Sequence, residues 1–100
     1  MVLLSLRAGH DAAERDAIMR GLAELRLPGL LSFRHGLNID VEGKSAEYPY
    51  GFSVTFTDRA ALDTYLADAT HRALGARLVA LCRGGGSGIF VADLDIEAVE

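Results

Sequence analysis

The fold is decided by residues 50–71, which read YGFSVTFTDRAALDTYLADATH. From Tyr50 to Phe56, aromatic or branched residues alternate with small or polar ones, the pattern of a strand with one buried face. Thr57 and Asp58 then supply side chains that favour a helix start, and after them the apolar residues recur every three or four positions. The stretch therefore predicts a strand that leads directly into a helix.

The chain before this stretch predicts a strand, a helix and a further strand. Val2–Arg7 is short and apolar with little polar relief, which is typical of a strand buried on both faces. Asp11 and Glu14 have the spacing of a capping box at a helix start, and Pro28-Gly29 ends that helix. Leu30–Asn38 alternates again and predicts the next strand.

One face of that strand should combine apolar side chains with a histidine. Alternation places four residues on one side of it, Leu31, Phe33, His35 and Leu37. A polar, glycine-containing loop at Ile39–Glu47 then joins it to the strand at Tyr50–Phe56, so the two form a long hairpin.

The chain after residue 70 predicts one more helix and one more strand. His71–Arg83 has helical apolar spacing and contains the single cysteine, Cys82. A glycine-rich loop at residues 84–88 breaks it, Ile89–Leu94 is the last strand, and Asp95–Glu100 is an acidic tail. The glycines do not form a phosphate loop, because such a loop follows a strand, precedes a helix and carries a lysine.

The predicted order is β-α-β-β-α-β, a ferredoxin-like α+β fold with a four-stranded antiparallel sheet. The 100 residues are enough for one domain, with a core at residues 2–94. Half of the residues are hydrophobic and 11 more are glycine, a composition that excludes disorder. Since both helices cover the same face of the sheet, a second copy is expected to cover the other.

Charge and cysteine content limit the class of protein further. The formal net charge of −4 argues against nucleic acid or an anionic membrane as a partner. Cys82 has no second cysteine with which to form an internal disulfide. Met1–Leu6 is too short for a signal peptide or a membrane-spanning helix. A cytoplasmic homodimer is the expectation.

Three stretches together resemble one known family. Pro28-Gly29, Phe33–Asn38 and Ala61–His71 are similar, in order and spacing, to the stress-responsive A/B barrel (Dabb) family. The resemblance implies a dimeric α+β barrel over nearly the whole chain. Most bacterial members of that family have no known activity, and one plant member is a polyketide cyclase.

The resemblance also implies where a site would lie. Tyr65 and His71 fall on the catalytic Tyr–His pair of the plant cyclase. A further histidine of that enzyme would lie at or before Met1, and its pocket tyrosine falls on Leu22, so the match is partial. Plant members are similar in holding a magnesium ion on main-chain carbonyls, and Leu27 and Leu30 are among the matching positions. No metal site is expected from side chains.

The residues themselves leave two interpretations of His71 and Tyr65 open. In the first, a neutral imidazole accepts a proton at pH 7 and the tyrosine orients it or a substrate oxygen. In the second, His71 caps the last helix and Tyr65 packs on the sheet. An apolar pocket next to the pair would be lined by Leu22, Phe52, Val54, Phe56 and Leu74, which are core residues by default.

The expected function follows from that pocket. The first hypothesis is a protein that binds a small apolar or aromatic molecule without turnover. The alternative is a cofactor-free enzyme of polyketide cyclase or lyase type that uses His71 and Tyr65. A third class, the heme-independent monooxygenases with the same dimeric architecture, has less support because the local motifs resemble the Dabb family. His35, on an apolar strand face, is expected to be a core or interface histidine.

Overall fold

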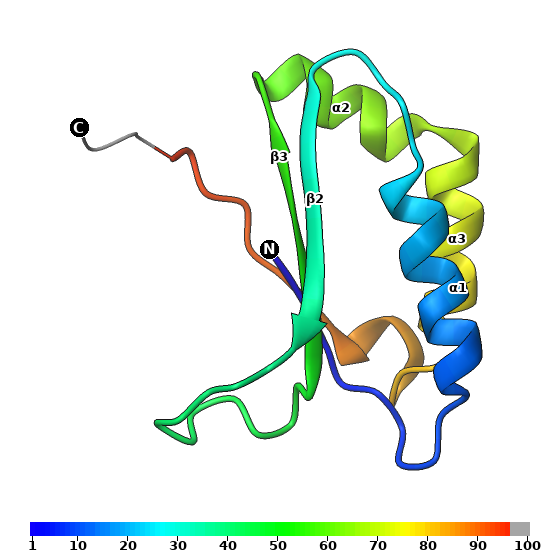
Figure 1. The fold of residues 1–100 in the computed structure, drawn as a ribbon, viewed down its shortest axis with the longest axis vertical. Helices are drawn as coiled ribbons and strands as arrows, with labels where there is room; N and C mark the ends of the chain where they lie inside the picture. The colour runs from blue at the N-terminus through cyan, green and yellow to red at the C-terminus, as the bar shows by residue number, and fades with distance from the viewer. Residues whose placement is uncertain (97–100) are drawn as a thin grey trace.

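The computed structural model describes residues 1–96 and shows one sheet with its helices on a single face (Figure 1). The sheet is antiparallel, with the strand order β2-β3-β1-β4. This is the ferredoxin-like α+β fold that the sequence predicts. The elements in chain order are β1 (Val2–Leu4), α1 (Ala12–Ala23), β2 (Leu30–Leu37), β3 (Tyr50–Phe56), α2 (Arg59–Ala67), α3 (Ala69–Val79), a short 3₁₀ turn η1 (Gly85–Gly88) and β4 (Ile89–Val91).

Each α-helix begins at an aspartate whose side chain accepts a hydrogen bond from a backbone N–H in the first turn. Those aspartates are Asp11, Asp58 and Asp68. They satisfy N–H groups that the helix itself leaves unpaired. The helix starts were therefore encoded locally in the sequence.

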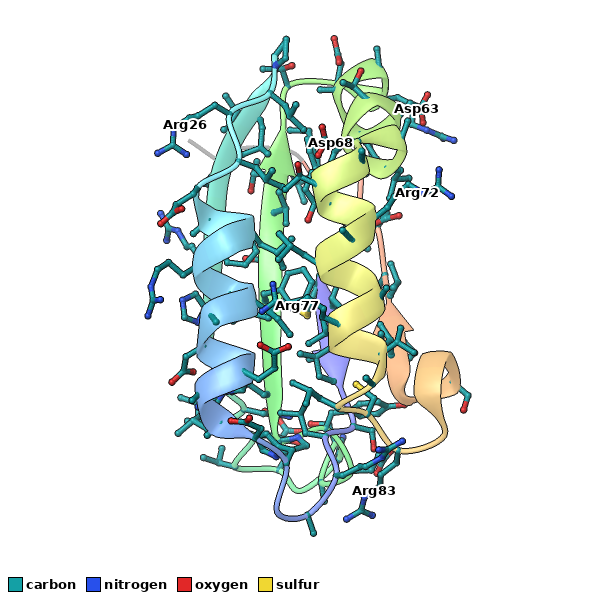
Figure 2. All side chains as sticks on the ribbon, turned by 90° about the vertical axis from the view of Figure 1, so that its right-hand side faces the viewer. Arg26, Asp63, Asp68, Arg72, Arg77 and Arg83 are labelled. Atoms are coloured by element: carbon teal, nitrogen blue, oxygen red, sulfur yellow. The ribbon has the colours of Figure 1, made fainter. Side chains whose placement is uncertain are left out.

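The second half of the predicted capping box does not form. The Glu14 carboxylate pairs instead with the Arg77 guanidinium, at 2.6 and 3.0 Å, and so ties α1 to α3. Figure 2 shows Arg77 between the two helices. The bidentate bond to Arg77 holds the pKa of Glu14 below its usual value.

The last helix is shorter than expected. It ends at Val79, and Cys82 lies beyond it, where it pairs as an isolated bridge with Leu6. The thiol is fully buried, and burial raises its pKa, so Cys82 is an inert apolar group. Gly84 and Gly85 adopt positive φ angles after the helix, which lets the chain turn back toward β4.

The alternation predicted for β2 is wrong at one position. The register of the β2–β3 pair shifts between Leu30 and Ser32, so Leu31 has no paired residue on β3. Its side chain is 62% exposed. An extra residue of this kind is a β-bulge, which interrupts the period-two pattern that the sequence prediction assumed.

The core lies between the sheet and the helices. Leu4, Tyr50 and Phe52 contribute to it from the central strands, and helices α1 and α3 cover them. The buried hydrophobic cluster is completed by Leu6, Ile18, Met19, Leu22, Leu74, Leu78 and Cys82.

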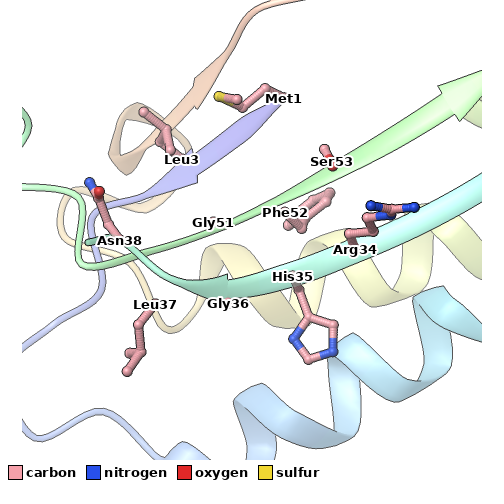
Figure 3. A pocket seen from close by; sticks show the side chains of 10 residues that line it. All are labelled: Met1, Leu3, Arg34, His35, Gly36, Leu37, Asn38, Gly51, Phe52 and Ser53. Carbon is pink, nitrogen blue, oxygen red and sulfur yellow. The ribbon is translucent and has the colours of Figure 1, made fainter. Parts of the chain in front are cut away.

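The face of the sheet opposite the helices is open. Leu3 pairs with Gly51 and Phe90, so these three residues face away from Leu4 and the core. A groove of about 340 Å³ lies on this side, and Figure 3 shows Met1, Leu3 and Ser53 on it, whereas His35 points toward α1. The two strands at the centre of the open face are β1 and β3.

Burial is uneven along the predicted strand Val2–Arg7. The structure has β1 only at Val2–Leu4, where Leu4 is fully buried and the other two residues are half-buried. Other exposed hydrophobic side chains include Ile39 and Val41 on the β2–β3 loop and Leu66 on α2. The predicted acidic tail lies mostly outside the described residues.

Truncation of Leu4 tests the centre of the core. Leu4→Ala should lower the free energy of unfolding by about 2–5 kcal/mol, because it leaves a cavity under both helices. Val41→Ala is the matched control, since Val41 is almost fully exposed and should change stability by less than about 0.5 kcal/mol. Denaturant unfolding at one fixed protein concentration measures both. Equal losses for the two variants would contradict the assignment of the core.

Candidate functional site

Tyr65 and His71 lie against each other at the junction of α2 and α3. Tyr65 is in the last turn of α2, and His71 is in the first turn of α3. Their ring centroids are 3.9 Å apart, with an angle of 36° between the ring planes. The structure therefore brings together the two residues that the sequence singled out, across a helix break that periodicity could not span.

Asp68 makes this junction. Its backbone N–H donates to the Tyr65 carbonyl at 3.2 Å, which closes α2. Its carboxylate accepts the backbone N–H of His71 at 2.9 Å, which opens α3. One residue with an extended ψ of 130° thus ends one helix and starts the next. His71 itself does not cap α3, contrary to the second interpretation of its role, whereas Tyr65 packs on Phe56 of β3, as that interpretation expects.

The polar atoms of the pair are buried without a partner. The Tyr65 hydroxyl and His71 Nδ1 have no hydrogen bond to any described residue. Leaving such a group unsatisfied costs about 1–3 kcal/mol, so buried polar atoms of this kind are uncommon. A hydrogen-bonding group from outside the chain, placed next to both rings, would satisfy them.

Burial also sets the protonation state of both rings. It raises the pKa of Tyr65 to about 12, so the hydroxyl stays protonated at neutral pH. It lowers the pKa of His71 below its usual value, and the Asp68 charge opposes that shift in part. At pH 7 the pair is therefore a neutral phenol beside a neutral imidazole.

The apolar residues predicted to line a pocket lie around this pair and in the adjoining core. The Phe56 ring contacts Tyr65 edge-on at 5.1 Å, and Val54 packs against the core from the same strand. The other three, Leu22, Phe52 and Leu74, are buried core residues. Two hollows of about 340 and 660 Å³ lie elsewhere, since neither is lined by Tyr65 or His71.

A second tyrosine–histidine contact was not predicted. His35 Nδ1 lies 2.6 Å from the Tyr50 hydroxyl. The Arg15 guanidinium covers the Tyr50 ring at 4.5 Å, and His10 Nε2 lies 3.4 Å from Arg15. Tyr50 pairs with Leu37, so His35 is its diagonal neighbour across the strands. The contact between His35 and Tyr50 could therefore be recognised only once the strand register was known. His35 is an exposed residue, not the core residue that was one of its two expected roles.

The C-terminal end of α1 is the place where the resemblance to plant members would put a magnesium ion bound by main-chain carbonyls. Arg26 Nη1 donates to the carbonyls of Ala23 and Leu25, at 3.0 Å each. The carbonyl of Leu27 accepts the N–H of Leu30 at 3.1 Å. A guanidinium in this position repels a divalent cation, so these residues do not fit the magnesium ion that only the resemblance to plant members suggests.

Within residues 1–96, no group of three or more His, Cys, Asp or Glu side chains could hold a metal ion. The same residues contain no helix that is long and apolar enough to span a membrane.

A four-stranded antiparallel sheet with its helices on one face, in this chain order, defines a ferredoxin-like α+β domain. Residues 1–96 match the model of the stress-responsive A/B barrel domain, Dabb. The chain belongs to this family. A search of curated proteins found no match.

Two solved structures have the same fold. One is a dimeric ferredoxin-like protein of unknown function from Jannaschia sp. CCS1, with 50% identity and a TM-score of 0.81 over 95% of this chain and 94% of that one. The other is a protein from Arabidopsis thaliana, with 20% identity and the same TM-score over 99% of this chain and 94% of that one. The second likeness concerns the fold alone.

The contact between Asp68 and His71 can be tested by titration. Asp68→Asn keeps a capping oxygen but removes the charge that favours the imidazolium, so the pKa of His71 should fall further. Asp58→Asn makes the same change at the start of α2, away from the pair, and should leave that pKa unchanged. NMR titration of the His71 ring measures both. An unchanged or raised His71 pKa in Asp68→Asn would contradict this account.

Proposed function

We propose that the protein is a homodimer that binds a small apolar or aromatic molecule between its helices and its sheet. The observation that carries this proposal is the pair of buried polar atoms, the Tyr65 hydroxyl and His71 Nδ1, without partners among the described residues. They lie at the edge of an aromatic and aliphatic layer. A ligand with an apolar body and one oxygen would match both features.

The dimer has separate support. The open face of the sheet exposes Met1 and Phe90 and half-buries Leu3, and a face of this kind is stabilised when a second surface covers it. The relative from Jannaschia sp. CCS1, 50% identical, is described as dimeric. We infer that this chain also pairs through its open face.

The alternative function is catalysis by the same two residues, as a cofactor-free enzyme of the polyketide cyclase or lyase type. The lowered pKa of His71 favours it, because the free imidazole can act as a base at neutral pH. His71 would remove a proton from a carbon next to a carbonyl, and Tyr65 would donate a hydrogen bond to the enolate oxygen. The carbon would then attack a second carbonyl of the same chain, and the proton would return to the new alkoxide.

Ligand binding can be measured with a matched set of small aromatics. Acetophenone and resorcinol should shift the NMR signals of Tyr65 and His71 in a saturable way, and ethylbenzene, which has no oxygen, should bind more weakly. Tyr65→Phe removes one hydrogen bond and should weaken acetophenone binding roughly fivefold. Tyr48→Phe, on a half-buried residue whose ring packs on Phe90 and not on the pair, is the control. Equal affinities for all three proteins would count against this site.

His71→Ala then separates the two functions. If a linear poly-β-ketone is converted to a cyclic product by the wild type, and the variant keeps affinity but loses turnover, the protein is an enzyme. A loss of affinity, with no turnover in the wild type, indicates a binding protein.

The dimer is tested by sedimentation. The mass at micromolar concentration should be twice the chain mass of 10.7 kDa. Leu3→Lys should raise the dissociation constant of the dimer roughly tenfold or more, because it places a charge in the apolar interface. Leu66→Lys adds the same charge at an exposed position of α2, on the side of the sheet that carries the helices, and serves as the control. A wild-type mass near that of one chain would refute the dimer.

A further inference from the structure

A second hollow, separate from the Tyr65–His71 pair, lies at the end of α1. It has a volume of about 660 Å³ and lies between the last residues of α1, the α1–β2 connection and the first half of β2. Its lining side chains are apolar except for Arg26 and Ser32, whereas polar atoms make up about half of the surface that lines it. Among the described residues it contains no acidic side chain. The apolar lining consists of Ala23, Leu25, Leu27, Pro28, Leu30, Leu31 and Phe33. We call this hollow the α1–β2 groove.

Arg26 is fixed at the edge of this groove by one of its three nitrogens. Nη1 donates to the carbonyls of Ala23 and Leu25, at 3.0 Å each. These carbonyls lie at the C-terminal end of α1, where the helix dipole attracts a positive charge. Figure 2 shows Arg26 beside the segment that joins α1 to β2. The guanidinium is thus held in place before any ligand arrives.

The other edge of the guanidinium is available. Neither Nε nor Nη2 of Arg26 has a hydrogen-bond or ion-pair partner within residues 1–96. Two parallel N–H groups on one edge of an arginine match the two oxygens of a carboxylate. Arg77, by contrast, uses this edge within the chain, in its pair with Glu14.

The β-bulge supplies the apolar side of the site. Because Leu31 is left out of the strand pairing, its side chain remains largely exposed beside the groove. Phe33 lines the same groove and packs on the Phe52 ring, at 5.4 Å between centroids, so it is held firmly. An apolar molecule could lie across these two side chains with its polar end at Arg26.

We propose that the α1–β2 groove binds a small monocarboxylic acid with an aliphatic or aromatic body, and that Arg26 holds its carboxylate in a bidentate pair. The apolar body lies against Leu31 and Phe33. This site is independent of the Tyr65–His71 pair, so either site can exist without the other.

The test uses the full-length protein in its native oligomeric state, with octanoate and benzoate as probes. Saturable binding should shift the Arg26 Nε–Hε signal in ¹⁵N NMR spectra. Arg26→Gln should weaken octanoate binding roughly tenfold or more, because it removes charge-assisted hydrogen bonds. Arg20→Gln makes the same change on an exposed arginine of α1 that does not line the groove, and should leave binding unchanged.

Octanamide is the matched uncharged probe and should bind at least roughly tenfold more weakly than octanoate. Three results would overturn the proposal: no saturable shift at Arg26, equal affinity of Arg26→Gln and Arg20→Gln, or equal affinity of octanamide and octanoate. The first of these is also the result expected if a second copy of the chain covers the groove.

Discussion

Leu4 lies at the centre of the sheet, paired with Tyr50 on one side and Ile89 on the other, and its side chain is fully buried in the core under the helices. Because side chains alternate along a strand, burying Leu4 on this face forces Leu3 onto the opposite one. Within residues 1–96, no further helix covers that second face. The burial of Leu4 therefore fixes the helical layer and also creates the open face through which we infer that a second copy binds.

The same helical layer creates the candidate site. Two helices separated by a single residue, Asp68, cannot continue in one line, so the rings of Tyr65 and His71 meet at the bend. Placing them there removes both polar atoms from water, which keeps the phenol protonated and the imidazole neutral. A site that is costly to leave unsatisfied in the folded chain is well suited to recognise an oxygen on an otherwise apolar ligand.

Charge at the two ends of α1 is used in two different ways. At its start, Glu14 is fully engaged by Arg77 and joins the helices. At its end, Arg26 is fixed by carbonyl oxygens and keeps one edge free. The first arrangement stabilises the fold, and the second is compatible with binding because no carboxylate of the described chain competes for the guanidinium. Residues of one type thus differ in role according to what the tertiary structure places beside them.

The sequence by itself determined the order of the elements, the aspartate caps at Asp11 and Asp58 and the choice of Tyr65 and His71, because periodicity and capping depend on neighbours a few positions away. The third cap, Asp68, was not predicted, since the last helix was expected to begin at His71. The sequence misjudged the end of α3, the face of Leu31 and the partner of Glu14. It also gave no sign of the Tyr50–His35 contact or of the fixed edge of Arg26. Those features were decided by the tertiary structure alone, since they depend on strand register, on a bulge and on contacts between elements far apart in the chain, none of which leaves a local pattern.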